Sequence, residues 1–171
     1  MPARLPGVRL FVAVRPPDAV LDAVDALGRP ERPDVRWTTR PQWHVTLRFL
    51  GEVADPGPVA AALDAAPLTG CEATLGPAVA RLGRGVVMVP VGGVETLAGE
   101  VVAATASIGR PPERRPFAGH LTLARVRRGP LRDLVGEPVD LRFPVVDVRL
   151  VRSHQGRGGA RYQDLHVRQL A

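Results

Sequence analysis

The sequence predicts an α+β fold in which two pseudo-symmetric lobes of antiparallel β-sheet, with helices on their outer faces, enclose a central cleft. Two observations predict this fold. A strand–helix–strand pattern occurs twice within one domain of residues 1–171, in units of about 8–80 and 86–150. The last strand of each pattern carries the same His-x-Thr-Leu motif, at residues 44–47 and 120–123. Two such units suggest a pair of related lobes.

The expected elements follow from hydrophobic periodicity and from Gly and Pro positions. The first unit contains a strand at 10–14, a helix ending near Gly28, a short strand at 35–38, the motif strand at 43–50, a helix at 58–66 and a strand at 71–82 kinked at Gly76-Pro77. The second unit contains a strand at 87–91, a helix ending near Gly109, the motif strand at 119–126, a turn at 127–130, one or two strands within 139–151 and a closing strand at 160–170.

Charge and composition limit the function classes. The net charge is +6, and all 23 basic residues are Arg. The excess lies in residues 86–171, which hold 13 Arg and 8 acidic residues, against 10 and 9 in residues 1–85. This asymmetry fits an anionic ligand and equally a solvated Arg-rich surface. The single cysteine, Cys71, excludes a disulfide scaffold and a thiolate zinc cluster. No apolar run suits a membrane span and no signal-peptide core is present, so we expect a cytoplasmic protein without membrane contact.

The two His-x-Thr strands carry the chemistry. Side chains alternate along a strand, so His44, Thr46 and Arg48 are expected on one face, opposite an apolar face. His120 and Thr122 share a face in the same way. If the lobes are related by approximate two-fold symmetry, the two faces meet across one groove. One imidazole can then act as general base and the other as general acid on a phosphodiester, while the Thr hydroxyls hold the phosphoryl oxygens.

The residue types in these motifs have other uses in proteins. A single His-x-Thr on a strand is usually an exposed His beside a β-favouring Thr. Two copies in matching positions favour catalysis, because duplication alone need not preserve a polar face. Paired histidines also bind metals, but the sequence has no His-Glu-x-x-His motif and no Cys cluster. We therefore do not expect a metal site.

The sequence resembles the two-histidine phosphoesterase superfamily and, within it, the RNA 2′,3′-cyclic phosphodiesterases that are also called 2′-5′ RNA ligases. The resemblance rests on the two motifs and their flanks, at residues 9–13, 43–52, 117–125, 150–153 and 158–162. One position departs from the family pattern, because Gly119 stands before the second His where Pro is frequent. This change removes no chemical group but suggests a looser entry into the strand.

The resemblance implies hydrolysis of a 2′,3′-cyclic phosphate at an RNA end, including tRNA fragments, to a 2′-phosphomonoester. His44 would donate a proton to the leaving 3′ oxygen and His120 would accept one from water, with Thr46 and Thr122 holding the phosphate. The reverse direction joins RNA halves through a 2′-5′ bond. No metal or cofactor is implied.

Further candidate residues each suit two roles. The family carries a substrate-contacting Arg at the position of Arg125, although strand alternation turns this residue away from His120 unless a bulge intervenes. Phe11 matches a family aromatic near the nucleobase, and equally suits a core position. Arg48 suits either the cleft or an ion pair. The loop at residues 155–161 is expected to be a hairpin turn, with contact to the RNA backbone as the alternative.

Two other functions remain open on the sequence alone. A non-catalytic, basic RNA-binding module would need only the net positive charge and would not require the two His-x-Thr motifs. A phosphodiesterase acting on small cyclic nucleotides would use the same motifs, because these contact only the phosphate. We expect a monomer, since the two halves already supply both sides of the cleft.

Overall fold

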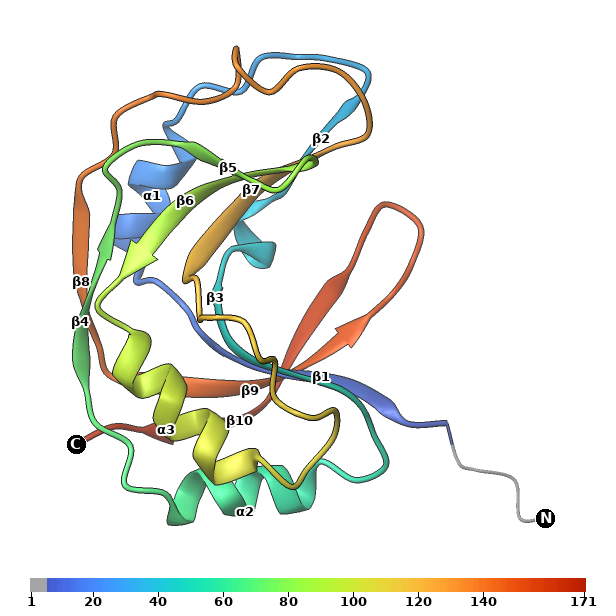
Figure 1. Cartoon of the computed structure of the whole chain (residues 1–171), viewed down its shortest axis with the longest axis vertical. Coiled ribbons are helices and arrows are strands. Elements are labelled where there is room, and N and C mark those ends of the chain that lie inside the picture. The colour runs from blue at the N-terminus through green and yellow to red at the C-terminus, as the bar shows by residue number, and fades with distance from the viewer. Residues whose placement is uncertain (1–5) are drawn as a thin grey trace.

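A computed structural model describes residues 6–171, in which ten strands and three α-helices form a curled antiparallel sheet with helices outside it (Figure 1). The strands are β1 (Val8–Val14), β2 (Val35–Trp37), β3 (Val45–Val53), β4 (Cys71–Leu75), β5 (Ala80–Leu82), β6 (Val86–Gly92), β7 (His120–Val126), β8 (Leu141–Val145), β9 (Asp147–His154) and β10 (Arg161–Gln169). The helices are α1 (Asp18–Asp25), α2 (Gly57–Ala65) and α3 (Glu95–Thr105). The predicted α+β class is confirmed.

Most predicted elements are present, with two refinements. The single strand expected over residues 71–82 is two strands, β4 and β5, which separate at the predicted kink around Gly76-Pro77. The region 139–151 holds two strands, β8 and β9. Residues 1–5, on which the expectation of no leader segment partly rests, lie outside the described range. No helix within residues 6–171 combines the length and apolarity needed to cross a membrane.

The sheet consists of two lobes that meet at β3 and β7. One lobe has the strand order β10-β9-β1-β3, and the other continues as β7-β6-β4-β8, with β2 paired to β7 and β5 to β6. Val45 of β3 and Leu121 of β7 form the register pair that joins the lobes, and both are 0% exposed. The buried core therefore runs continuously beneath the junction.

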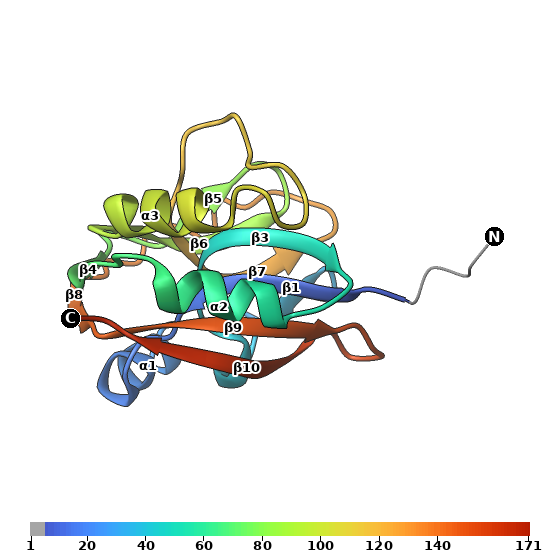
Figure 2. The same cartoon turned by 90° about the horizontal axis from the view of Figure 1, so that it is seen from below.

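The helices cross between the lobes. The helix α1 follows β1 but packs against β8, at the far edge of the other lobe. The helix α3 follows β6 but packs against β3 and α2. Figure 2 shows α1 and α3 on opposite sides of the molecule. These two helices, α1 and α3, pack on the lobe to which their preceding strands do not belong, so the two lobes are held as one body.

Two β-bulges lie directly after the His-x-Thr motifs. On β3, Thr46 pairs with Ala13 and Arg48 with Val12, so Leu47 is an extra residue. On β7, Thr122 pairs with Met88 and Ala124 with Val87, so Leu123 is extra in the same way. A bulge reverses the alternation of the residues that follow it. The expected faces are therefore correct through Leu47 and Leu123, which are buried as expected, and are reversed at Arg48 and Phe49 on β3 and at Arg125 on β7.

Candidate active site

The two motif histidines make matching hydrogen bonds to the backbone. The Nδ1 atom of His44 lies 2.8 Å from the carbonyl oxygen of Gln42, and that of His120 lies 2.9 Å from the carbonyl oxygen of Ala118. A carbonyl can only accept, so Nδ1 carries the proton in both rings. The Nε2 atom of each neutral imidazole then keeps its lone pair for chemistry. In both cases the acceptor is the backbone two residues earlier, which holds each ring at the start of its strand.

The register at the lobe junction brings the four predicted residues together. Because Val45 and Leu121 are antiparallel partners, one step along each strand sets His44 opposite Thr122 and Thr46 opposite His120. The paired valine and leucine point into the core, so the four polar side chains share the other face. The lobes thus present two His-Thr pairs around one point.

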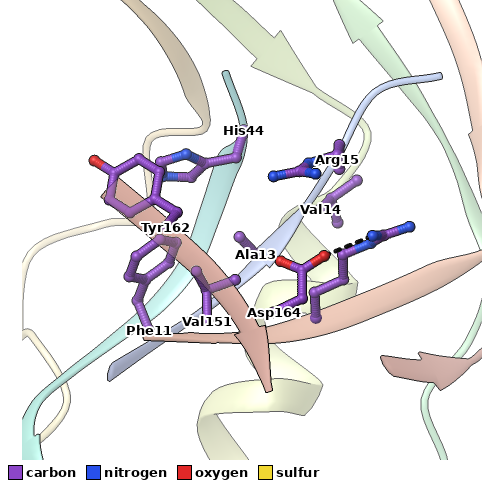
Figure 3. A pocket seen from close by; sticks show the side chains of 9 residues that line it. Phe11, Ala13, Val14, Arg15, His44, Val151, Tyr162 and Asp164 are labelled. Carbon is purple, nitrogen blue, oxygen red and sulfur yellow. Dashed lines mark hydrogen bonds and ion pairs between the residues drawn. The ribbon is translucent and has the colours of Figure 1, made fainter. Parts of the chain in front are cut away.

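Aromatic rings enclose His44. The ring of Phe11 stacks on the imidazole with centroids 4.7 Å apart, and the ring of Tyr162 meets it edge-on at 5.0 Å (Figure 3). Burial, assisted by the charges of Arg15 and His120, lowers the pKa of His44 to about 4 against the opposing effects of the Gln42 carbonyl and Asp164. The free enzyme therefore holds this imidazole neutral at neutral pH. Its Nε2 atom accepts the hydroxyl proton of Thr46 at 3.0 Å.

Phe11 does not take the position expected from the resemblance. The side chain is only 5% exposed, and its ring supports His44. A nucleobase therefore has no access to it, and Phe11 positions the imidazole instead. Tyr162, which contacts the rings of both Phe11 and His44, is a site residue that the sequence patterns do not single out. Its only sequence signal is its place at the end of a block that resembles the family.

The bulges decide the places of the two candidate arginines. Arg125 was expected to face the cleft only if a bulge lay between it and His120, and the bulge at Leu123 provides this. Arg125 is exposed and turned to the face of the cleft. The bulge at Leu47 turns Arg48 away from His44, and Arg48 is 4% exposed. Its guanidinium donates to the Oγ1 and carbonyl of Thr105 and to the carbonyls of Ile108 and Arg110, at distances of 2.8 to 3.4 Å. Arg48 thus caps the C-terminal end of α3.

A cavity of about 560 Å³ adjoins Thr46 and His120. Its apolar lining includes Phe49, which the bulge on β3 brings to the cleft face, together with Leu82 and Phe117. Both of the latter are 36% exposed. The guanidinium carbon of Arg9 lies 4.8 Å from the centre of the Phe49 ring. Regular alternation predicts Phe49 in the core, so this wall of the cleft does not follow from the sequence.

Gly119 tightens the entry into β7 rather than loosening it. Its carbonyl accepts the amide of Val91 at 2.9 Å, and a Cβ at this position would collide with the Val91 carbonyl. The absence of a side chain therefore lets the chain before His120 approach β6 closely.

The loop at residues 155–161 lies at the turn of the β9–β10 hairpin, which projects from the rest of the sheet (Figure 1). The side-chain amide of Gln42 donates to the carbonyl of Ala160 at 2.8 Å, which ties this turn to the segment before His44. No group of three or more His, Cys, Asp or Glu residues suited to a metal ion occurs within residues 6–171.

Solved structures resemble this chain over nearly its full length. A phosphoesterase is 26% identical, with a TM-score of 0.81 and coverage of 96% of this chain and 99% of the other. The protein TT0787 of Thermus thermophilus is 28% identical, with a TM-score of 0.80 and coverage of 95% and 97%. Escherichia coli LigT bound to 3′-AMP is 26% identical, with a TM-score of 0.78 and coverage of 98% and 99%.

No protein-family model and no curated protein sequence matches the chain. The LigT protein has also been solved with ATP, NADP+ and phosphate. The likeness to phosphoesterases and LigT supports an enzyme of the phosphodiesterase type. Because this fold is shared across both lobes, the chain belongs to the two-histidine phosphoesterase superfamily.

Proposed function

We propose that the chain hydrolyses 2′,3′-cyclic phosphates at RNA ends to 2′-phosphomonoesters, using His44 and His120 as a general acid–base pair. One observation carries this proposal, namely the pairing of Val45 with Leu121, which sets His44 opposite Thr122 and Thr46 opposite His120. A phosphoryl group between these pairs has an imidazole on each side and a hydroxyl beside each imidazole.

The reaction balances with these groups alone. His120 accepts a proton from water at Nε2 as the water oxygen attacks phosphorus. The bond from phosphorus to the 3′ oxygen breaks, and His44 gives its Nε2 proton to that oxygen. The hydroxyls of Thr46 and Thr122 donate to the non-bridging oxygens, where negative charge develops. Neither step requires a metal.

His44 must first gain the proton that it donates. Its pKa of about 4 leaves it neutral in the free enzyme, because of its burial. A phosphate charge about 4 Å away contributes roughly 4 kcal/mol at an effective dielectric constant of about 20, which is roughly a thousandfold in proton affinity. The substrate anion therefore brings the proton to His44 as it binds.

The same pair also accounts for ligation, in which a different nucleophile attacks the cyclic phosphate. A 5′-hydroxyl of a second RNA takes the place of water, so its oxygen forms the new bond to phosphorus as the 3′ oxygen leaves. The cavity beside Thr46 and His120 supplies an apolar wall, with Phe49 and Phe117, on which the terminal nucleobase can lie.

The test is turnover of a short RNA that ends in a 2′,3′-cyclic phosphate, measured in EDTA. We expect conversion to the 2′-phosphate in the unaltered protein. His44→Ala and His120→Ala should each lose about 10² to 10⁴ in kcat, and the double variant should lose much less than the product, because the two groups act as a unit. His154→Ala, which alters a histidine bonded to Gln163, is the matched control and should keep its activity.

Other outcomes redirect the proposal. Turnover of cyclic mononucleotides without turnover of RNA would indicate that the substrates are small cyclic nucleotides. Salt-sensitive RNA binding without any turnover favours a binding module. We also propose that the protein acts as a monomer in the cytoplasm, and a stable dimer in sedimentation at micromolar concentration contradicts the first part.

A further inference from the structure

One oxygen of the Asp164 carboxylate is buried without a hydrogen-bond partner. The oxygen Oδ2 accepts from the guanidinium of Arg149 at 2.7 Å, whereas Oδ1 has no donor within the described residues 6–171. A buried acceptor that lacks a donor is unfavourable for folding. Asp164 lines the same small pocket as His44 and Tyr162 (Figure 3). The position of this oxygen therefore needs a reason other than stability.

The strand β10 directs Asp164 toward His44. Side chains alternate along a strand, so Asp164 shares a face with Tyr162, whose ring meets the imidazole of His44 edge-on at 5.0 Å. Asp164 also pairs with Val151 of β9, which belongs to one apolar cluster with Phe11. The pocket has a volume of about 10 Å³, which leaves room for one water molecule at most. Little solvent therefore screens the carboxylate from the imidazole.

The ion pair of Asp164 is not neutral as a whole. The guanidinium of Arg149 also donates to the carboxylate of Asp147, at 3.2 and 3.4 Å. One positive charge is thus shared by two negative charges, and one negative charge remains uncompensated. Asp164 lines the pocket of His44 and Asp147 does not, so the excess charge acts on the imidazole mainly through Asp164.

Several charged or titratable groups face His44 from the elements packed around it. They are Arg15 after β1, His120 on β7, Arg149 on β9, and Tyr162 and Asp164 on β10. Burial lowers the pKa of His44 most, Arg15 and His120 act in the same direction, and Asp164 opposes them together with the Gln42 carbonyl. Among these side chains only Asp164 carries a negative charge at neutral pH.

We propose that Asp164 is a positioning residue for the reaction, because its charge stabilises the imidazolium form of His44 from which the 3′ oxygen takes its proton. Arg149 holds the carboxylate in place, and Arg15 limits its effect. The proton still passes from Nε2 of His44 to the 3′ oxygen, and Asp164 neither gains nor loses one. This inference rests on the proposed function and deepens it, because it assigns control of the general acid to a residue outside the two His-x-Thr motifs.

The experiment measures the pKa of His44 by NMR of its imidazole, in the free protein and with saturating sulfate as the anion probe. The spectrum of His44→Gln assigns the signal. Asp164→Asn removes the charge but keeps an oxygen that can accept from Arg149, and it should lower the proton affinity of His44 at least about threefold, or about 0.5 pKa unit. Arg15→Gln should raise that affinity by a similar factor. Loss of packing alone does not produce two shifts of opposite sign.

Asp147→Asn is the matched control. It makes the same change of charge at the other carboxylate bonded to Arg149, outside the pocket of His44. It should shift the pKa of His44 by less than half as much as Asp164→Asn. Equal shifts in these two variants, or no shift in Asp164→Asn, would overturn the proposal. If the asparagine variant does not fold, Asp164→Thr removes the same charge with a residue that favours strands.

Turnover of the cyclic-phosphate RNA gives a second measurement. The limb of the kcat profile that reports protonated His44 should move to lower pH in Asp164→Asn and to higher pH in Arg15→Gln. Above that limb, Asp164→Asn should lose about threefold or more in kcat with little change in KM. A loss confined to KM would place Asp164 in substrate binding and overturn the proposal.

Failure of the proposed function is distinguishable from failure of this inference. If the unaltered protein turns over no RNA, the proposed function fails, whereas the NMR titrations still decide whether Asp164 controls the charge of His44. Turnover together with an unshifted imidazole in Asp164→Asn keeps the proposed function and overturns the role of Asp164.

Discussion

Val45 of β3 pairs with Leu121 of β7 at the junction of the two lobes, and each lies between the His and the Thr of its own motif. The relative position of the two imidazoles therefore depends on this one register pair, which lies between them. Both of these side chains are completely buried. Packing at this point and geometry in the cleft are coupled.

Leu121→Ala should accordingly weaken both stability and catalysis. Loss of a buried leucine side chain costs about 2 to 5 kcal/mol of unfolding free energy. The cavity also frees the lobes to shift, and a displacement of about 1 Å between catalytic groups can cost about 10² in rate. Urea unfolding and kcat measure the two effects. Leu97→Ala, which removes a buried leucine from α3, is the control and should lower stability with a smaller effect on kcat.

The buried imidazole of His44 should make stability depend on pH. Its pKa in the folded protein is about 4, below the ordinary value of 6.5, because of burial. The unfolded chain therefore takes up this proton first, and stability falls as the pH drops from 6.5 toward 4. The loss from pH 7 to pH 5 should be about 2 kcal/mol.

His44→Gln should remove that part of the pH dependence, which denaturant titrations at several pH values measure. His154→Gln, which changes a histidine bonded to Gln163, is the matched control, and a change of slope found equally in both variants would not be specific to His44. An identical slope in His44→Gln and the unaltered protein would show that His44 titrates alike in the folded and unfolded states.

Alternation along the motif strands could be predicted from the sequence through Leu47 and Leu123, and failed after them. The cause is an extra residue at Leu47 on β3 and at Leu123 on β7, which no residue type indicates, and a second register shift on β3 leaves Leu50 extra as well. Leucine is unremarkable in a strand, and a bulge depends on the register of the neighbouring strand. The helix and strand positions were predictable because their apolar periods are local.

The exchange of helices between lobes could not be predicted, for a similar reason. The apolar faces of α1 and α3 show that each helix packs on a sheet, but not on which lobe. The pairing of Arg36 with Arg125 depends likewise on β2 joining β7, a contact between segments 89 positions apart. The two His-Thr pairs could be identified in advance because each His lies two residues before its Thr on one strand.

Arg48→Met should separate a structural from a catalytic role of this arginine. The change leaves the carbonyls at the end of α3 without their buried donor, at a cost of about 2 kcal/mol or more. We expect a lower urea midpoint with little change in the pH profile of kcat. A large loss of kcat at unchanged stability would show that Arg48 reaches the substrate.

Gly119→Ala should displace the second motif without removing any of its functional side chains. The added Cβ would collide with the Val91 carbonyl, so the segment before His120 must move. We expect kcat to fall by about tenfold or more, through misplacement of the imidazole. Gly99→Ala is the control, because a Cβ there meets nothing within 4 Å and alanine favours the helix. That variant should retain kcat and gain stability.

Anion binding should carry a proton into the cleft. Sulfate serves as the probe, because it does not itself titrate near neutral pH. Burial keeps the pKa of His44 at about 4 in the free protein, so in mildly acidic buffer the imidazole is almost entirely neutral. A bound anion raises its proton affinity by roughly a thousandfold, which makes protonation favourable.

Calorimetric titration with sulfate near pH 6, in two buffers of different ionisation enthalpy at constant ionic strength, measures the proton uptake. We expect uptake approaching one proton for each sulfate bound by the unaltered protein, and most of it should be absent in His44→Gln. Binding enthalpies that are equal in the two buffers would mean that His44 stays neutral beside the anion. The proton for the 3′ oxygen would then have to come from His120, and the two histidines would exchange their roles.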